Sequence, residues 1–322
     1  MRPASDSARR HVFEWRRFVI SSQFGMDGEH TNRRRGTDRR AIHSALIFQH
    51  LSFGTWGIPS MIDLNLTGRR AVVTGASLGI GAATVRLLAD HGADVAFCAR
   101  SQDAVNELDG YQPSSGDGGA HGHVADMADR SSIDAFFESV LADGTVDILV
   151  NNVGASPSRN FLYMTDDDWE ELFRLNLLSA VRSTRHCLPG MRKQKWGRVV
   201  MIASGAAKYP GAALIDYGAS KAAMVATGKA LSGKYGRDNV LFNSVLPGLI
   251  HTAMWERAAK EIANARGGDW EDIIRNNGKS VPVGRYGTSE EVANMVVFLC
   301  SEAASYVNGA VIDVDGGQGR HI

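Results

Sequence analysis

The chain has 322 residues, and its 35 Lys and Arg residues are balanced by 35 Asp and Glu residues, so the formal net charge is zero. This balance argues against a nucleic-acid-binding protein, which usually carries a basic excess. Hydrophobic residues make up 44% of the chain and aromatic residues 8%, as in ordinary globular proteins, and the body of the chain has no apolar run long enough to span a membrane.

The first 60 residues differ in composition from the rest. They contain ten arginines, no lysine and five acidic residues, and residues 1–40 show no persistent hydrophobic period. Residues 41–60 resemble a targeting segment in part, but histidines and a glutamine interrupt the apolar run and no cleavage pattern is convincing. We expect residues 1–60 to be a disordered or accessory extension, with targeting or a functional arm as alternatives, and residues 61–322 to form one folded domain.

From Met61 onward, short β-branched runs alternate with helical patterns such as Gly81–Gly92, Ser131–Asp143, Thr165–Leu188 and Ser220–Tyr235. Most of the short runs are continuously apolar, which is typical of parallel strands covered on both faces. The alternation predicts an α/β fold, a doubly wound (Rossmann) seven-stranded parallel sheet with helices on both faces. The expected strands are Arg70–Thr74, Asp94–Ala99, His121–Val124, Ile148–Asn151, Arg198–Ala203, Leu241–Leu246 and Val311–Val314.

Three cysteines, Cys98, Cys187 and Cys300, are far apart in the sequence and form no CxxC pair. They predict neither a disulfide framework nor a zinc site, and we expect no metal. Buried thiols in a reducing cytoplasm are the expected state.

A glycine-rich segment, TGASLGIG at residues 74–81, follows the first strand and opens a helix. Gly75 permits a tight turn, Gly79 lets the backbone approach a pyrophosphate, and Gly81 lets the helix pack on the strand. The helix N-terminus would present unpaired N–H groups to the phosphates. The spacing is GxxxGxG rather than the common GxGxxG, but its place at the first β–α junction predicts a dinucleotide-binding turn.

The second strand ends in Arg100, without the acid that NAD-binding sheets of this type tend to place there. Arg100 could form a charge-assisted bond with a 2′-phosphate, so NADP(H) is favoured, NAD(H) is possible, and a solvated surface arginine is the alternative. Asp126 and Met127 follow the third strand, where a side chain can contact an adenine.

Asn151-Asn152-Val153-Gly154 ends the fourth strand. A buried amide pair at this place can brace neighbouring strands and close a nicotinamide pocket, and for Asn151 bracing alone is the favoured role.

Tyr217 and Lys221 in YGASK are spaced i, i+4, which puts both side chains on one helix face. Carbonyl reduction requires a proton donor, and a free tyrosine, with a pKa of about 10, is too weak an acid to cycle near neutrality. An ammonium one helical turn away favours the phenolate.

Ser204, just past the fifth strand, could bond a substrate oxygen beside Tyr217. Asn176, inside an apolar helix, needs a partner such as a backbone carbonyl or a water that relays protons to Lys221.

These motifs resemble the short-chain dehydrogenase/reductase family, in its branch of single-domain enzymes that includes 3-oxoacyl-acyl-carrier-protein reductases. The matching segments are TGASLGIG, NNVG, YGASK, LPGLIHT and VIDVDGG, and the resemblance covers Met61 to about Gly317. It implies that Tyr217 is the general acid/base, Ser204 orients the substrate, Lys221 lowers the pKa of Tyr217, and Asn176 anchors the relay water. The implied cofactor-binding residues are Gly75, Ser77, Leu78, Gly79, Ile80, Gly81, Arg100, Asp126, Met127, Asn152, Gly154, Tyr217, Lys221, Ile250 and Thr252.

The sequence departs from the family pattern at two positions. Val153 replaces the usual Ala of NNAG and would press toward the cofactor, which we expect to be tolerated. Leu78 stands where many NADP-dependent members carry a basic residue, which leaves Arg100 as the one visible phosphate partner.

The function predicted from these residues is hydride transfer between NADP(H) and a carbonyl or secondary alcohol, and a non-catalytic dinucleotide-binding regulator is the alternative. Residues 249–285 would form a lid over the active site, and the walls at 155–158 and 205–214 are mostly small or apolar. We therefore expect a moderately apolar small molecule: a 3-oxoacyl thioester, a cyclic ketone or a steroid-like compound. We further expect a cytoplasmic homo-oligomer, dimer or tetramer, with no nucleic-acid or membrane partner.

Overall fold

The computed structural model describes residues 62–113 and 117–319, so the extension expected at residues 1–60 lies outside it. The sheet has seven strands in the order β3-β2-β1-β4-β5-β6-β7, and every neighbouring pair is parallel. The predicted sheet is therefore confirmed, with small shifts at strand ends. The strands are β1 Arg70–Thr74, β2 Asp94–Ala99, β3 Gly119–Val124, β4 Ile148–Asn151, β5 Gly197–Ile202, β6 Val240–Pro247 and β7 Val311–Val314.

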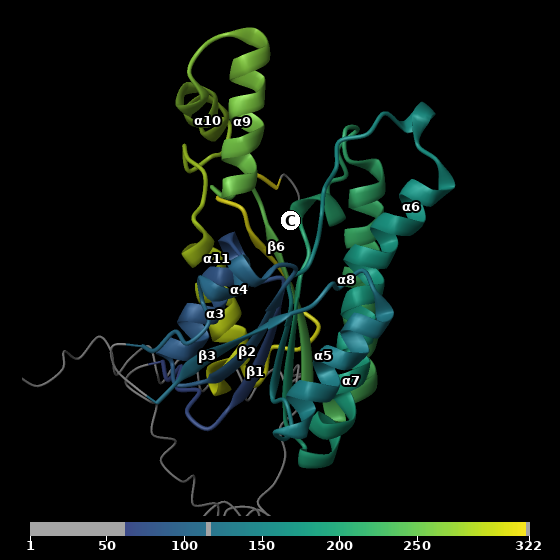
Figure 1. Ribbon diagram of the computed structural model, residues 1–322, viewed down its shortest axis with the longest axis vertical. Coiled ribbons are helices and arrows are strands. Elements are labelled where there is room, and N and C mark those ends of the chain that lie inside the picture. The colour runs from purple at the N-terminus through teal and green to yellow at the C-terminus, as the bar shows by residue number, and fades with distance from the viewer. Residues whose placement is uncertain (1–61, 114–116, 320–322) are drawn as a thin grey trace, which may run out of the picture. The chain divides into compact units, whose positions relative to one another are not determined.

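Helices cover both faces of the sheet (Figure 1). On one face α3 packs against α11, and on the other α5 packs against α7 beside α8. The helices are α3 Gly79–Asp90, α4 Gln102–Asn106, α5 Arg130–Ala142, α6 Asp166–Phe173, α7 Ser179–Gln194, α8 Ile215–Tyr235, α9 Ala253–Arg266, α10 Trp270–Gly278 and α11 Ser289–Cys300. Among these described helices, none combines the length and the apolar character needed to cross a membrane.

Two hydrophobic cores lie on the two faces of the sheet, as the alternation of side chains along a strand requires. In β1, Ala71 and Val73 belong to the core beneath α3 and α11, whereas Val72 belongs to the core beneath α5 and α7. Burying both faces explains why the central strands β1 and β4 are almost continuously apolar. Cys98 and Cys187 lie in these cores, and burial raises the pKa of the Cys98 thiol to about 12, so the thiol stays protonated.

The helix expected at Thr165–Leu188 is interrupted. A capping box between Thr165 and Asp168 begins α6, and a π-helical turn at Arg174–Leu178 separates α6 from α7. A π turn inserts one extra residue and often occurs at functional sites. Asn176 lies within this turn and is fully buried.

Helix α8 begins at Ile215, five residues before the start of the predicted helix, so Tyr217 lies in its first turn. The strand order reverses between β1 and β4, and ligands of doubly wound sheets bind outside the carboxyl ends of the strands at such a reversal. Helices α9 and α10 stand above this edge (Figure 1), where the lid was expected.

Candidate functional site

The turn between β1 and α3 depends on its glycines. Gly75 and Gly79 have positive φ angles of 68° and 59°, which other residues adopt only with strain. A Cβ on Gly81 would lie 2.5 Å from the Gly75 carbonyl oxygen and 2.6 Å from Asn152 Nδ2. Gly75 therefore permits the turn and Gly81 the close approach of helix and strand, whereas the role of Gly79 toward a pyrophosphate stays a prediction.

Asn152 braces this turn from the end of β4. Its Nδ2 donates to the carbonyl oxygens of Thr74 at 3.2 Å and Gly75 at 2.7 Å, and its backbone N–H donates to Thr74 Oγ1 at 3.2 Å. The neighbouring Val153 faces the same turn, because a Cβ on Gly75 would lie 2.8 Å from Val153 Cγ2. The extra methyl groups of Val153 thus contact Gly75. Asn151, by contrast, is buried and its Nδ2 lies 3.3 Å from Thr184 Oγ1, a bracing contact.

Several polar groups around the turn are free for a ligand. The N-terminus of α3 has no side-chain cap and no acidic residue in its first turn, so its positive end is available to an anion. Thr252 Oγ1 is buried without a hydrogen-bond partner among the described residues, and the Thr252 methyl group lies 3.3 Å from a Cβ placed on Gly79. Arg100 is exposed at the end of β2 and has no ion pair to another described residue. These residues fit a phosphate-bearing dinucleotide.

The other predicted cofactor-binding positions differ in exposure. Leu78 is 54% exposed at the turn, and Ser77 and Ile80 are half-buried beside it. Asp126 is exposed and its carboxylate accepts from the Ala128 backbone. Met127 is buried in the core, so its side chain faces away from solvent and only its backbone is left for an adenine. Ile250 is also buried, and it pairs with Gly287 in a single β-bridge.

Lys221 is the buried cation of the site. Its Nζ donates to the Ile202 carbonyl oxygen at 2.9 Å, at the end of β5, and lies 6.0 Å from the centre of the Tyr217 ring. A Cβ on Gly154 would lie 2.9 Å from Lys221 Nζ and 3.4 Å from Asn176 Oδ1. The structure thus brings Gly154, Asn176, Tyr217 and Lys221 together from three separate segments.

The electrostatics of Tyr217 and Lys221 are dominated by burial. Burial lowers the pKa of Lys221 to about 8, because the ammonium is removed from water. Burial also raises the pKa of Tyr217 above its usual value, and a hydrogen bond with the Ser204 side chain opposes that rise. The effect of Lys221 on the pKa of Tyr217 stays a prediction.

Asn176 has a backbone carbonyl as a partner, which is one of the two kinds of partner that were expected for it. Its Oδ1 accepts from the Ala155 N–H at 2.9 Å, and its Nδ2 donates to the Ala155 carbonyl at 3.0 Å and to Ser220 Oγ at 3.0 Å. The amide therefore clamps the segment after β4 to α8, and a relay water at Asn176 stays a prediction. The clamp explains why a polar residue occupies this buried π turn.

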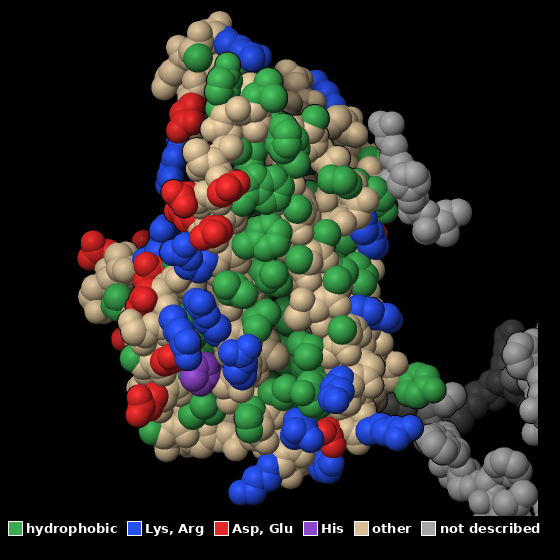
Figure 2. Space-filling model, turned by 90° about the vertical axis from the view of Figure 1, so that its right-hand side faces the viewer, with side chains coloured by type: hydrophobic (Ala, Val, Ile, Leu, Met, Phe, Trp, Pro, Cys, Tyr) green, Lys and Arg blue, Asp and Glu red, His purple; other side chains and the backbone are tan. Residues whose placement is uncertain are grey.

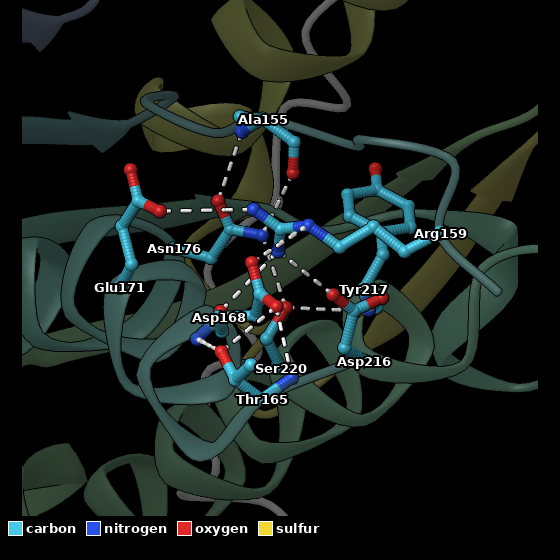
Figure 3. A network of polar contacts seen from close by, with 9 residues as sticks. All are labelled: Ala155, Arg159, Thr165, Asp168, Glu171, Asn176, Asp216, Tyr217 and Ser220. Atoms are coloured by element: carbon cyan, nitrogen blue, oxygen red, sulfur yellow. Dashed lines mark hydrogen bonds and ion pairs between the residues drawn. The ribbon is translucent and has the colours of Figure 1, made fainter. Parts of the chain in front are cut away.

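Three residues of this site were missed by sequence reasoning: Arg159, Asp216 and Ser220 (Figure 3). Arg159 forms ion pairs with Asp168 at 3.3 Å, Glu171 at 3.6 Å and Asp216 at 3.2 Å. One signal was present in the sequence, since Arg159 is the only basic residue between β4 and the end of α6, and the acids 166–168 follow it closely.

The comparisons with known proteins agree with this geometry. Residues 75–318 match the family described as enoyl-(acyl carrier protein) reductase. An uncharacterised oxidoreductase of Bacillus subtilis, YvrD, is 37% identical over 80% of this chain and 98% of its own length, and the 3-oxoacyl-[acyl-carrier-protein] reductase FabG of Aquifex aeolicus is 36% identical over 80% and 99%.

Among solved structures, L-sorbose reductase from Gluconobacter frateurii, complexed with NADPH and L-sorbose, superposes with a TM-score of 0.76. It is 33% identical, and the match covers 81% of this chain and all of that one. The glycine-rich turn, the Tyr–Lys pair and these matches lead to one conclusion: the chain belongs to the short-chain dehydrogenase/reductase family.

Proposed function

We propose that this chain is an NADP(H)-dependent carbonyl reductase in which Tyr217 is the proton donor. The observation that carries the proposal is the meeting of Tyr217, Lys221 and Asn176 with Gly154 beside the glycine-rich turn, at the carboxyl edge of the sheet. A regulator that only senses a dinucleotide has no need of a phenol and a buried ammonium at that place, so the non-catalytic alternative is not favoured.

The turn at 75–81, Thr252 and Arg100 would hold the cofactor, which supplies a hydride to the carbonyl carbon. The Tyr217 hydroxyl donates the proton to the carbonyl oxygen, and the Ser204 hydroxyl, already bonded to Tyr217, orients that oxygen. Lys221, with a pKa of about 8, is mostly an ammonium at neutral pH and favours the phenolate left on Tyr217. Helices α9 and α10 close the cleft and exclude water.

The substrate that we propose is a small ketone or secondary alcohol. The named activities of two relatives, reduction of a 3-oxoacyl chain and of L-sorbose, both concern such a group. In this chain Arg159 is occupied by three carboxylates, so it does not serve as a clamp for an acidic substrate. A moderately apolar ketone is favoured, and a 3-oxoacyl thioester, a cyclic ketone and a steroid-like compound remain candidates.

We also propose that the protein is a cytoplasmic homo-oligomer. Figure 2 shows hydrophobic side chains gathered in a band on the face that α6, α7 and α8 form. Leu178, at the end of the π turn between α6 and α7, and Ile215, the first residue of α8, are 40% and 37% exposed. Small residues of α8, such as Ala222 and Ala226, permit close helix packing, and a second copy would bury the band.

Removing the phenolic hydroxyl tests the mechanism directly. Tyr217→Phe should lower kcat for a ketone substrate by roughly 100- to 10,000-fold, the usual contribution of general acid catalysis. NADPH should still bind, as measured by its fluorescence. A variant that keeps the wild-type rate would contradict the proposal.

Cofactor choice depends on Arg100. Arg100→Ala should raise the NADPH dissociation constant by roughly 10- to 100-fold and leave NADH binding unchanged, because it removes a charge-assisted bond to the 2′-phosphate. Arg86→Ala, which removes an exposed arginine from the C-terminal half of α3, is the matched control. A wild type that prefers NADH, or an Arg100→Ala variant with an unchanged preference for NADPH over NADH, would contradict the assignment of Arg100 as the partner of the 2′-phosphate.

The buried ammonium should reduce stability while it supports activity. The native pKa of Lys221, about 8, is below its unfolded value near 10.5, so the native state bears the full desolvation cost below pH 8 and escapes it as pH rises toward 10.5. Lys221→Met should therefore have a free energy of unfolding at pH 7 that is higher than that of the wild type by up to about 3 kcal/mol, as measured by urea denaturation. At pH 9.5 the increase in the free energy of unfolding should be smaller.

Lys229→Met, which removes an exposed lysine from the same helix, should show no such pH-dependent gain. A Lys221→Met variant that is less stable than the wild type by the same amount at both pH values would contradict this prediction.

The molar mass of the protein in solution tests whether it forms the proposed oligomer. Light scattering after gel filtration should give two or four chain masses for the wild type. Ala226→Arg, on the exposed part of α8, should shift the protein toward the monomer, whereas Ala265→Arg on α9 should not. A monomeric wild type would refute the proposed assembly.

A further inference from the structure

The backbone of Tyr217 is held at both ends by side chains. Its N–H donates to Asp216 Oδ1 at 2.8 Å, and its carbonyl oxygen accepts from Ser220 Oγ at 2.8 Å. Each partner has a further contact of its own. Asp216 Oδ2 pairs with Arg159 Nη1 at 3.2 Å, and Ser220 Oγ accepts from Asn176 Nδ2 at 3.0 Å.

Both anchors lead to the same short segment, residues 155–159, which leaves the end of β4 (Figure 3). Asn176 binds the N–H and carbonyl of Ala155, and Arg159 is itself the last residue of the segment. The first turn of α8 is thus tied to this segment by two parallel links, one neutral and one ionic. Tyr217 lies between them.

The ionic link is not an ordinary surface salt bridge. The side chain of Asp216 is 1% exposed and that of Arg159 is 23% exposed. Exposed ion pairs contribute little, but a buried carboxylate that loses its cation is left uncompensated, and Arg159 is the one ion-pair partner of Asp216 within residues 62–113 and 117–319. Glu171, at 71% exposure and 3.6 Å, is the weakest partner of the same guanidinium.

Arg159 is also fixed at its other edge. Its Nε pairs with Asp168 Oδ1 at 3.3 Å, and Asp168 caps α6 through Thr165. The guanidinium plane is therefore held between α6 and α8, which gives it one orientation. A cation so fixed can set the position of the carboxylate it binds.

We propose that Arg159 is a positioning residue for Tyr217. Through Asp216 it fixes the first turn of α8 against residues 155–159, and so fixes where the phenol meets the substrate oxygen. This inference rests on the proposed role of Tyr217 as the proton donor. A displacement of about 1 Å in a catalytic group such as the Tyr217 phenol can reduce a rate 100-fold. Loss of the Arg159–Asp216 ion pair should therefore lower kcat far more than it weakens cofactor binding.

The test compares four variants: Arg159→Met, Arg159→Lys, Asp216→Asn and the double variant Arg159→Met/Asp216→Asn. We expect Arg159→Met to lower kcat by roughly 10- to 100-fold with the NADPH dissociation constant unchanged, and Arg159→Lys to recover most of the loss because it keeps the charge. The double variant should be no slower than Arg159→Met, because the two residues act as one unit. Glu171→Gln is the matched control and should keep the wild-type kcat.

Several results would overturn the inference. One is a wild-type kcat in Arg159→Met. Another is a loss that only follows the folded fraction, measured by circular dichroism in the same samples, and a third is additive effects in the double variant. If Arg159→Met does not fold, Asp216→Asn is the variant that tests the positioning role, since it keeps an oxygen for the Tyr217 N–H and removes the ionic link. A wild-type kcat in Asp216→Asn would then refute the positioning role of Arg159.

Tyr217→Phe separates this inference from the function it rests on. An active Tyr217→Phe enzyme would refute the proposed function. An inactive one, beside an Arg159→Met enzyme with wild-type kcat, would refute only the positioning role.

Discussion

The site depends on one buried cation. Lys221 Nζ has the Ile202 carbonyl oxygen as its hydrogen-bond acceptor at the end of β5, in a place where burial lowers its pKa to about 8. An ammonium in such surroundings is costly, and it is retained where it has chemistry to perform. Gly154 leaves room for it, because a Cβ at that position would lie 2.9 Å from the Nζ atom and the lysine would have to shift.

The cofactor end and the chemical end are joined by the chain between β4 and α6. Asn152 at its start holds the glycine-rich turn, and Ala155 and Arg159 further along hold the π turn and α8. A single segment, residues 152–159, therefore sets the distance between the glycine-rich turn at residues 75–81 and the Tyr217 phenol. That arrangement explains why its polar side chains bond the backbone of neighbouring elements.

Most of the fold could be predicted from the sequence, because the strands of a parallel sheet are buried on both faces and stand out as apolar runs between helical patterns. The Tyr217–Lys221 pair could be predicted as well, since an i, i+4 spacing on a helix is local information. The π turn at Asn176 could not, because it results from packing between α6, α8 and the Ala155 segment. The Arg159–Asp216 pair, 57 residues apart, likewise depends on the tertiary fold. The burial that raises the pKa of Tyr217 is likewise not visible in the motif, because it too depends on the tertiary fold.

The central claim is that the phenol of Tyr217 and the ammonium of Lys221 face the nicotinamide end of a bound NADPH. A crystal structure of the complex with NADPH tests it most directly. We expect the pyrophosphate over the turn at 75–81 and the nicotinamide beside Gly154, within reach of both side chains. A nicotinamide bound elsewhere, with Tyr217 and Lys221 turned away from it, would contradict the account.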